Sequence, residues 1–262
     1  MSRGDFNQNV PAMRRKSGVL LTAGLFALAA GALFLWPHPK AHAYPMQEDV
    51  FVEGAGYVDG DLVLSSGGYG NSYIGRLVDG RVTSKLLLPE PYFAEGFTQL
   101  GEKVYWLTWQ DHTAFVLTYE NGTFTASDTT FTYPTEGWGL TNDGEHLWMS
   151  DGSSTLHVID PKTFEDVRRL SVTMNGAPVD QLNELEYVDG FLYANVWMET
   201  VILKIDAQTG EVVKRFDLDA LAQESAKRGD SDSVLNGIAH IEGDDFYLFG
   251  KNWTNYYRVT LR

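Results

Sequence analysis

From residue 44 onward, the chain alternates short runs of β-branched and aromatic residues with glycine-containing turns. The clearest examples are five stretches: "YVDGDLVLSS", "LGEKVYWLTW", "TNDGEHLWMS", "YVDGFLYANVW" and "IEGDDFYLFGK". In each, one apolar run leads into a Gly or Asp-Gly turn and a second run leads out, as in a β-hairpin. The sequence therefore predicts five hairpins in regular succession.

Each hairpin is followed by two further strand-like segments, such as "TLHVIDPKTFEDVRRLSV" and "ILKIDAQTGEVVKRFDL". Four strands per repeat and five repeats predict an all-β fold, a five-bladed β-propeller. The last repeat lacks a fourth strand, and we expect residues 44–50 to supply it and close the ring. The longest insertion, residues 219–233, predicts a short helix followed by a loop.

Aligning the hairpins on their turns reveals one repeated polar position, with spacings of 42, 41, 47 and 53 residues. Its members are Glu53, Glu95, Glu136, Asn183 and Asn236. Fourteen residues further on, the second strand returns to the same rim at Gly67, Trp109, Ser150, Trp197 and Gly250, with Asp151 and Lys251 one residue beyond. Because the innermost strand of each blade lines the central channel, we expect both columns to meet at one mouth of it.

A polar floor with aromatic walls is the usual composition of a small-molecule site. Two carboxylates roughly 6 Å apart repel by about 3 kcal/mol at an effective dielectric of 20, or about two pKa units. We therefore expect one of the three glutamates to hold a proton near neutrality and to serve as a general acid and base. In the alternative interpretation, these glutamates only tie neighbouring blades together by accepting backbone N–H bonds.

The tryptophans divide by their place in the pattern. Trp106 and Trp148 lie inside strand-like runs and are predicted to be core residues. Trp109, Trp138 and Trp197 lie next to the polar position and are predicted to wall the site.

The first 43 residues have a different character. Basic "RRK" precedes an uncharged run of 19 residues, 18–36, and the small-x-small triplet "AHA" ends at residue 43. This layout predicts a secretory signal cleaved ahead of Tyr44, or an uncleaved N-terminal membrane anchor. We therefore divide the chain into a signal or anchor, residues 1–43, and a propeller domain, residues 44–262. The domain is expected outside the cytosol, periplasmic or secreted.

The net charge limits the binding partners of the chain, and the lack of cysteine limits how its fold can be stabilised. A net charge of −15 argues against nucleic acid and anionic membrane surfaces. The absence of cysteine excludes disulfides and thiolate metal sites, so the core alone must hold the fold. We expect a monomer that touches a membrane only through its N-terminal segment, where that segment is retained.

Several motifs together resemble a known family. "FVEGAGYVDG", "YFAEGFTQLGEKVYWLTW", "EGWGLTNDGEHLWMSDGSSTLHVIDPKTF", "VDQLNELEYVDGFLYANVW" and "VLNGIAHIEGDDFYLFGKNW" are similar, in order, to successive blades of the plant-type glutaminyl-peptide cyclotransferases. The resemblance covers nearly all of residues 51–262. Each motif is weak alone, but "EGWGLT", "NELEY" and "YANVW" in this order are specific.

The resemblance implies an acyltransferase that converts N-terminal glutamine of peptides and proteins to pyroglutamate and releases ammonia, without a catalytic zinc and with no required cofactor. It implies Glu95 as the acid/base and Lys251 as a polar contact, and both are predicted to be catalytic. We expect Glu95 to take the proton of the amine and return it to the departing nitrogen, while an amide or the Lys251 ammonium stabilises the developing oxyanion. Substrate-binding roles fall on Phe51, Glu53, Phe93, Trp109, Glu136, Trp138, Asn183, Trp197 and Asn236. One residue departs from the pattern. The family's first blade usually reads Phe-Thr-Gln-Gly-Leu, whereas here "FVEGAG" places the acid Glu53 in the position of a neutral carboxamide.

Two other functions remain open on the sequence. Oxygen ligands from Glu53, Glu136, Asn183 and Asn236 suit Ca²⁺ or Mg²⁺ in a metal-dependent lactonase or esterase. An exported propeller that binds a peptide or protein without catalysis is the other. A structural Ca²⁺ in the channel is compatible with all three interpretations.

Overall fold

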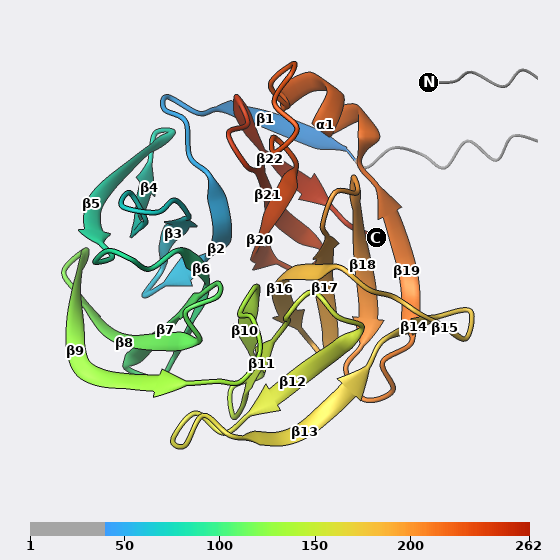
Figure 1. The fold of residues 1–262 in the computed structure, drawn as a ribbon. Coiled ribbons are helices and arrows are strands. Elements are labelled where there is room, and N and C mark those ends of the chain that lie inside the picture. The colour runs from blue at the N-terminus through green and yellow to red at the C-terminus, as the bar shows by residue number, and fades with distance from the viewer. Residues whose placement is uncertain (1–39) are drawn as a thin grey trace, which may run out of the picture. The chain divides into compact units, whose positions relative to one another are not determined.

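The computed structural model describes residues 40–262, and its main strands form five four-stranded antiparallel sheets around a common centre (Figure 1). The first sheet contains β2 (Val52–Val58), β3 (Asp61–Ser66), β4 (Tyr73–Val78) and β5 (Arg81–Leu87). The second contains β6 (Ala94–Leu100), β7 (Lys103–Thr108), β8 (Thr113–Glu120) and β9 (Thr123–Thr132). The third contains β10 (Leu140–Asn142), β11 (Leu147–Met149), β12 (Thr155–Ile159) and β13 (Asp166–Ser171). The fourth contains β16 (Leu182–Val188), β17 (Phe191–Val196), β18 (Val201–Asp206) and β19 (Val212–Asp217). The fifth contains β20 (Leu235–Glu242), β21 (Asp245–Gly250), β22 (Asn255–Thr260) and β1 (Ala41–Pro45).

The prediction of an all-β, five-bladed propeller is confirmed. The first strand of each of the five hairpins is innermost, and these strands contact one another in the order β2, β6, β10, β16, β20 and back to β2. Two small additions lie between blades: the hairpin β14 (Thr173–Met174) and β15 (Ala177–Pro178), and the helix α1 (Asp219–Ser225). The helix falls within the insertion predicted to contain one.

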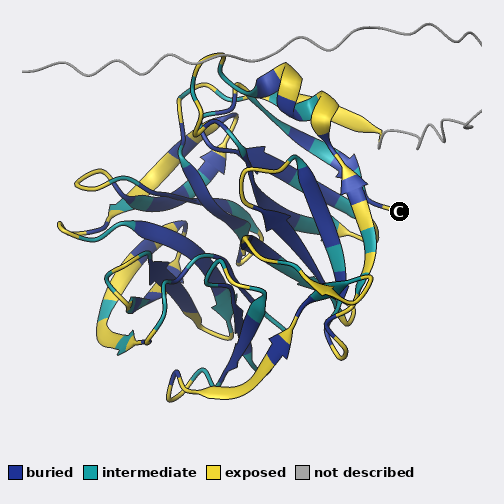
Figure 2. Ribbon diagram, turned by 45° about the vertical axis from the view of Figure 1, so that its right-hand side comes forward, coloured by how far each residue is buried: buried dark blue, intermediate teal, exposed yellow. Residues whose placement is uncertain are grey.

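Apolar side chains form five buried clusters, one between each pair of neighbouring blades. Trp106 packs between the first and second blades, and Trp148 between the third and fourth, so both are core residues as predicted. Figure 2 shows the buried residues gathered in the strands near the centre, while the outer strands and α1 carry the exposed ones. The clusters hold neighbouring blades together by burying apolar area, with no disulfide among residues 40–262.

The strand that closes the ring is shifted from its predicted place. We expected residues 44–50, but β1 spans Ala41–Pro45 and pairs antiparallel with β22, from Ala41 opposite Val259 to Pro45 opposite Asn255. Val50, the last residue of the expected segment, is instead buried in the cluster between the first and fifth blades. The domain boundary drawn before Tyr44 therefore falls inside β1.

Most of the predicted signal or anchor segment, residues 1–39, lies outside the described residues. Within residues 40–262, none of the helices is long and apolar enough to cross a membrane.

Candidate active site

The repeated polar position gathers at one end of the ring of inner strands. Glu53, Glu95, Asn183 and Asn236 lie at or near the first residue of β2, β6, β16 and β20, and each is at most 6% exposed. Lys251, directly after β21, is also buried. The two predicted columns therefore meet at one mouth, as the hairpin arithmetic indicated.

Each of these four inner strands has a register shift at the polar residue. The pairing slips between Val52 and Gly54 in the first blade, between Ala94 and Phe97 in the second, and at the matching places in the fourth and fifth. A β-bulge adds an unpaired residue and re-aims its side chain. The bulges thus explain why polar side chains from four blades turn out of the strand ladder.

The glycine that follows each glutamate has a packing role. A Cβ at Gly54 would lie 3.1 Å from the Cα of Gly96, and one at Gly96 would lie 2.6 Å from the backbone nitrogen of Leu140. Side chains here would push neighbouring inner strands apart. The repeated Glu-Gly pair therefore combines a polar side chain with the close approach of the next blade.

Glu53 is the hub of the polar contacts. The Nζ of Lys251 lies 2.8 Å from its Oε1 and 2.7 Å from its Oε2. The side-chain amide of Asn236 donates to Oε2 at 3.3 Å and to the carbonyl of Val52 at 2.9 Å. Burial raises the pKa of Glu53, whereas the charge and hydrogen bond of Lys251 oppose that rise.

Glu95 lies beside Glu53 and Lys251, and its pKa is raised further than that of Glu53. Burial, and next the negative charge of Glu53, raise the pKa of Glu95 well above its ordinary value, against the opposing influence of Lys251. The two carboxyl groups are close enough for each to shift the pKa of the other. The raised pKa favours the neutral carboxylic acid form of Glu95, the form that the repulsion argument expects for one of the three glutamates.

Glu136 has a different environment. Its Oε2 accepts the indole N–H of Trp109 at 2.7 Å and of Trp138 at 2.9 Å, and its Oε1 accepts from Gln110 at 3.0 Å. Although burial opposes it, these hydrogen bonds, that of Trp138 first, hold the pKa of Glu136 below its usual value. An ionised Glu136 therefore orients two tryptophan rings of the wall.

Aromatic rings surround the polar floor. Phe93 contacts Phe51, Tyr69 and Trp109, with ring centroids 6.4, 5.2 and 5.7 Å apart. On the other side, Trp138 and Trp197 meet edge to face at 5.9 Å. The predicted wall tryptophans are thus placed together, and the ammonium of Lys251 lies 4.8 Å from the ring centre of Phe51.

Comparison with known proteins agrees with this arrangement. A sequence model described as glutamine cyclotransferase matches residues 36–261. The chain belongs to the glutamine cyclotransferase family. It is 35% identical over 226 residues to a glutaminyl-peptide cyclotransferase of Arabidopsis thaliana, covering 84% of this chain and 69% of the relative.

A solved structure is similar as well. The crystal structure of Myxococcus xanthus glutaminyl cyclase superposes with a TM-score of 0.77 at 31% identity, over 85% of this chain and 96% of that one. Membership of the glutamine cyclotransferase family places the chain among enzymes, as the resemblance of its motifs implied.

Two buried oxygens at the mouth of this glutamine cyclotransferase fold have no hydrogen-bond partner within residues 40–262. They are the side-chain carbonyl oxygens of Asn183 and Asn236. A buried polar atom without a partner is costly, and in a binding site it marks a place for a ligand donor. These oxygens can accept hydrogen bonds from N–H groups of a ligand.

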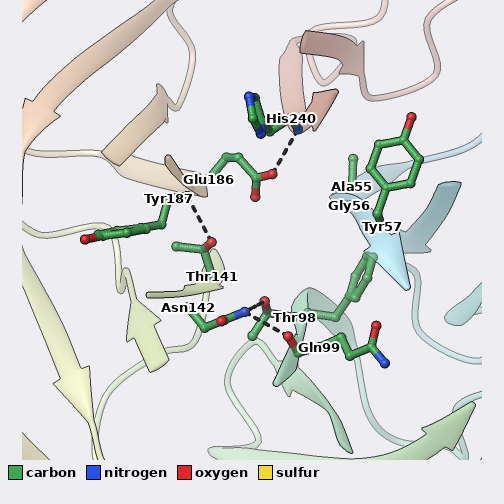
Figure 3. Close-up of a pocket in the computed structure, with 11 residues that line it drawn as sticks. Ala55, Gly56, Tyr57, Thr98, Gln99, Thr141, Asn142, Glu186, Tyr187 and His240 are labelled. Carbon is green, nitrogen blue, oxygen red and sulfur yellow. Dashed lines mark hydrogen bonds between the residues drawn. The ribbon is translucent and has the colours of Figure 1, made fainter. Parts of the chain in front are cut away.

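The opposite end of the same inner strands holds a separate cavity of about 170 Å³, shown in Figure 3. Residues from the far ends of β2, β6, β10, β16 and β20 line it, among them Tyr57, Gln99, Asn142, Glu186 and His240. Neither Glu53 nor Glu95 lines this cavity, so it is separate from the candidate active site.

The tying role that the sequence offered as an alternative belongs to two other glutamates of "NELEY". Glu184 accepts the backbone N–H of Ala55 at 3.2 Å and of Ile238 at 2.8 Å, and Glu186 accepts that of His240 at 2.9 Å. These bonds join β16 to β2 and β20. Sequence reasoning missed both residues, although two acids two positions apart on an inner strand were a usable signal.

Tyr69 was also missed. It follows "GG" in the turn after β3, is 55% exposed, and its ring contacts Phe93 at the rim. Gly67 lies at the rim, as the spacing of the hairpins predicted. It leaves room for the ring of Phe93, because a Cβ at Gly67 would lie 2.3 Å from that ring.

Proposed function

We propose that the chain cyclises the N-terminal glutamine of peptides and proteins to pyroglutamate and releases ammonia. Membership of the glutamine cyclotransferase family supports this reaction class. The observation that carries the proposal is a buried carboxyl group, Glu95, next to the Glu53–Lys251 ion pair and to the aromatic ring of Phe93, with a pKa raised by burial. That arrangement supplies a proton donor in a site that excludes water.

The substrate enters as the free amine. An α-amino group has a pKa of about 8, so a substantial fraction is unprotonated in mildly alkaline solution. In the proposal, the orphaned oxygens of Asn183 and Asn236 accept N–H bonds from the amine and the side-chain amide of the substrate. The rings of Phe93, Trp109 and Trp197 hold the glutamine side chain in a cyclic, reactive shape, which supplies much of the acceleration.

Glu95 then moves both protons of the reaction. The amine nitrogen attacks the carbonyl carbon of the substrate side chain, and a C–N bond forms. One carboxyl oxygen of Glu95 gives its proton to the amide nitrogen, which leaves as ammonia when the old C–N bond breaks. The other oxygen takes the proton released by the attacking amine, so Glu95 ends the cycle neutral as it began. The sequence-based hypothesis had Glu95 accept a proton first, and the raised pKa favours donation instead.

Lys251 is proposed to stabilise the oxyanion that develops on the carbonyl oxygen. Two of its contacts go to Glu53. An ammonium carries three donors, which leaves one for the substrate.

The interpretation as a metal-dependent hydrolase finds less support in the contacts of the predicted oxygen ligands. The oxygens of Glu53 are occupied by a lysine ammonium, and those of Glu136 by indole and amide N–H groups. Within residues 40–262, no cluster of three or more His, Asp or Glu has the spacing of a metal site. The proposed chemistry uses side chains of this chain alone, and we propose that it acts in the exported domain.

The test is ammonia release from Gln-Xaa peptides by residues 40–262 near pH 8, with and without EDTA. We expect chelator-insensitive release and a product lighter by one ammonia. Glu95→Gln should lower kcat by at least about a hundredfold with the fold intact, the size of a lost general acid. Glu186→Gln, a matched change of a glutamate at the other end of the inner strands, should retain activity.

A folded protein that releases no ammonia from any Gln-Xaa peptide would overturn the proposed reaction. Near-normal turnover by Glu95→Gln would overturn only the assignment of Glu95. Loss of release on adding EDTA would instead point to a metal-dependent reaction.

A further inference from the structure

The two carboxyl groups nearest the centre of the site are forced together by the backbone. Gly54 and Gly96, the residues after Glu53 and Glu95, touch across β2 and β6, with a built Cβ at Gly54 only 3.1 Å from the Cα of Gly96. Glu53 is 1% exposed and Glu95 6%. Both side chains are therefore buried where two inner strands approach most closely.

Two neighbouring carboxyl groups in such a place share one proton, because a second negative charge has little solvent to stabilise it. Their other contacts decide where the proton resides. Glu53 receives the ammonium of Lys251 on both oxygens and the amide of Asn236 on one. No side-chain donor among residues 40–262 reaches the carboxyl oxygens of Glu95 apart from this pairing.

The remaining charged and titratable groups around the pair act in the same direction or are neutral. The ionised Glu136 adds a further negative charge near Glu95. The hydroxyl of Tyr133 donates to the carbonyl of Thr108, and burial raises its pKa well above the ordinary value, so this group is neutral. Lys251 is the cation of this cluster, and it is engaged by Glu53.

We propose that the Glu53–Lys251 ion pair keeps Glu95 in its protonated, proton-donating form, which makes Glu53 a positioning residue for the reaction. The inference rests on the proposed function for the use of that proton. Lys251 stabilises the charge on Glu53, and the charge on Glu53 in turn prevents Glu95 from ionising. An acid at position 53 therefore supports the reaction in this chain, where a neutral amide would leave the lysine free to draw a charge onto Glu95.

The direct test is the titration of the Glu95 carboxyl, followed by ¹³C NMR of residues 40–262 labelled at the glutamate side-chain carboxyl carbons. Glu95→Gln assigns the resonance by its disappearance. In the unmodified chain, we expect Glu95 to remain protonated at pH 7. In Glu53→Gln, the midpoint should fall by about one to two pH units, because Glu95 then pairs with the unneutralised Lys251.

A double variant separates this electrostatic role from a structural one. Glu53→Gln with Lys251→Met removes both charges, so Glu95 is left buried without a cation and should again titrate above neutrality. A thermal unfolding curve for each variant confirms that the site has remained folded. An unchanged midpoint in Glu53→Gln, or an ionised Glu95 at pH 7 in the unmodified chain, would overturn the proposal.

Kinetics supply the second readout. In Glu53→Gln, the alkaline limb of the kcat–pH profile should move to lower pH by the same amount as the Glu95 midpoint. A merely structural role for Glu53 would scale kcat equally at every pH and would leave the limb in place. Because the NMR titration does not depend on turnover, failure of the proposed reaction and failure of this inference give different results.

Discussion

Glu136 illustrates how one carboxylate can hold several side chains of a site in place. A single carboxylate oxygen holds two indole N–H groups, and the second oxygen holds Gln110. Hydrogen bonds to a charged acceptor contribute about 1.5–3 kcal/mol each. Two neighbouring tryptophan rings of the wall, Trp109 and Trp138, are therefore held by one negative charge.

Replacing that charge should affect binding more than chemistry. In Glu136→Ala, the two indoles lose their acceptor and become free to turn, so we expect KM for a Gln-Xaa peptide to rise about tenfold or more. The value of kcat should change less, because Glu95 and Lys251 stay in place. Steady-state kinetics measure both constants, and Glu145→Gln, an exposed glutamate of the same blade, is the control. An unchanged KM would show that the indoles are held by packing alone.

Sequence predicted the position of Glu136 but not its environment. The arithmetic about the hairpin turns treated Glu53, Glu95 and Glu136 as equivalent, which was wrong. The inner strand of the third blade begins only at Leu140, so Glu136 precedes the strand, whereas Glu53 and Glu95 lie in bulges. A spacing argument finds which residues reach one rim, but contacts between different blades decide whether a carboxyl is buried.

At the scale of elements, side chains of β16 form hydrogen bonds with the backbones of two other inner strands, β2 and β20. Glu184 bridges the backbones of β2 and β20, and Glu186 bonds the backbone N–H of His240 near the cavity of Figure 3. Glu184 is buried, whereas Glu186 is half-buried and lines the cavity. Burial, and for Glu184 also the charge of Glu186, raise the pKa of each group, that of Glu186 to about 7.

This raised pKa predicts a pH-dependent stability. Between the ordinary value of 4.5 and about 7, the folded chain binds the proton of Glu186 more tightly than the unfolded chain. Its contribution to the free energy of unfolding is therefore fully present below about pH 4.5 and falls as the pH rises to about 7. The full shift corresponds to at most about 3 kcal/mol, and water in the cavity reduces it.

Glu186→Gln removes this titration while keeping an oxygen for the backbone of His240. We expect the difference in the free energy of unfolding between the unmodified chain and the variant to shrink or reverse as the pH is raised from 4.5 to 7. Urea unfolding at several pH values measures it, with exposed Glu102→Gln as the control. A difference that is constant across this range would contradict the protonated state of Glu186.

For the whole molecule, the decisive feature is that the ring closes on a strand from the other end of the chain. Three strands of the fifth blade come from the C-terminal residues, and β1 completes the sheet from the N-terminal side (Figure 1). The repeat count predicted that such a strand must exist. Its location was missed because β1 has no alternating apolar pattern: four of its five residues are exposed, and only Tyr44 is partly buried.

Tyr44 supplies most of the packing of this closure. Its ring stacks on Tyr256 at 5.1 Å and meets Tyr247 edge to face at 5.9 Å, while the backbone of β1 pairs with β22 over five residue pairs. Buried aromatic pairs are worth about 0.5–1.5 kcal/mol beyond the area that they bury. Without β1, the strand β22 would become an edge and leave its backbone groups to water.

Removing β1 should therefore destabilise the entire propeller, because every blade is held by neighbours on both sides. We expect residues 46–262 to melt about 5–10 °C below residues 40–262, from a loss of about 2–3 kcal/mol spread over a domain of this size. Tyr44→Ala in the longer chain keeps the backbone ladder and should fall between the two. Equal melting temperatures for the two lengths would mean that the closure of the ring does not depend on β1. A chain cut directly before Tyr44 keeps the Tyr44 ring but loses three of the five residue pairs of β1, so its melting temperature should also fall between those of the two lengths.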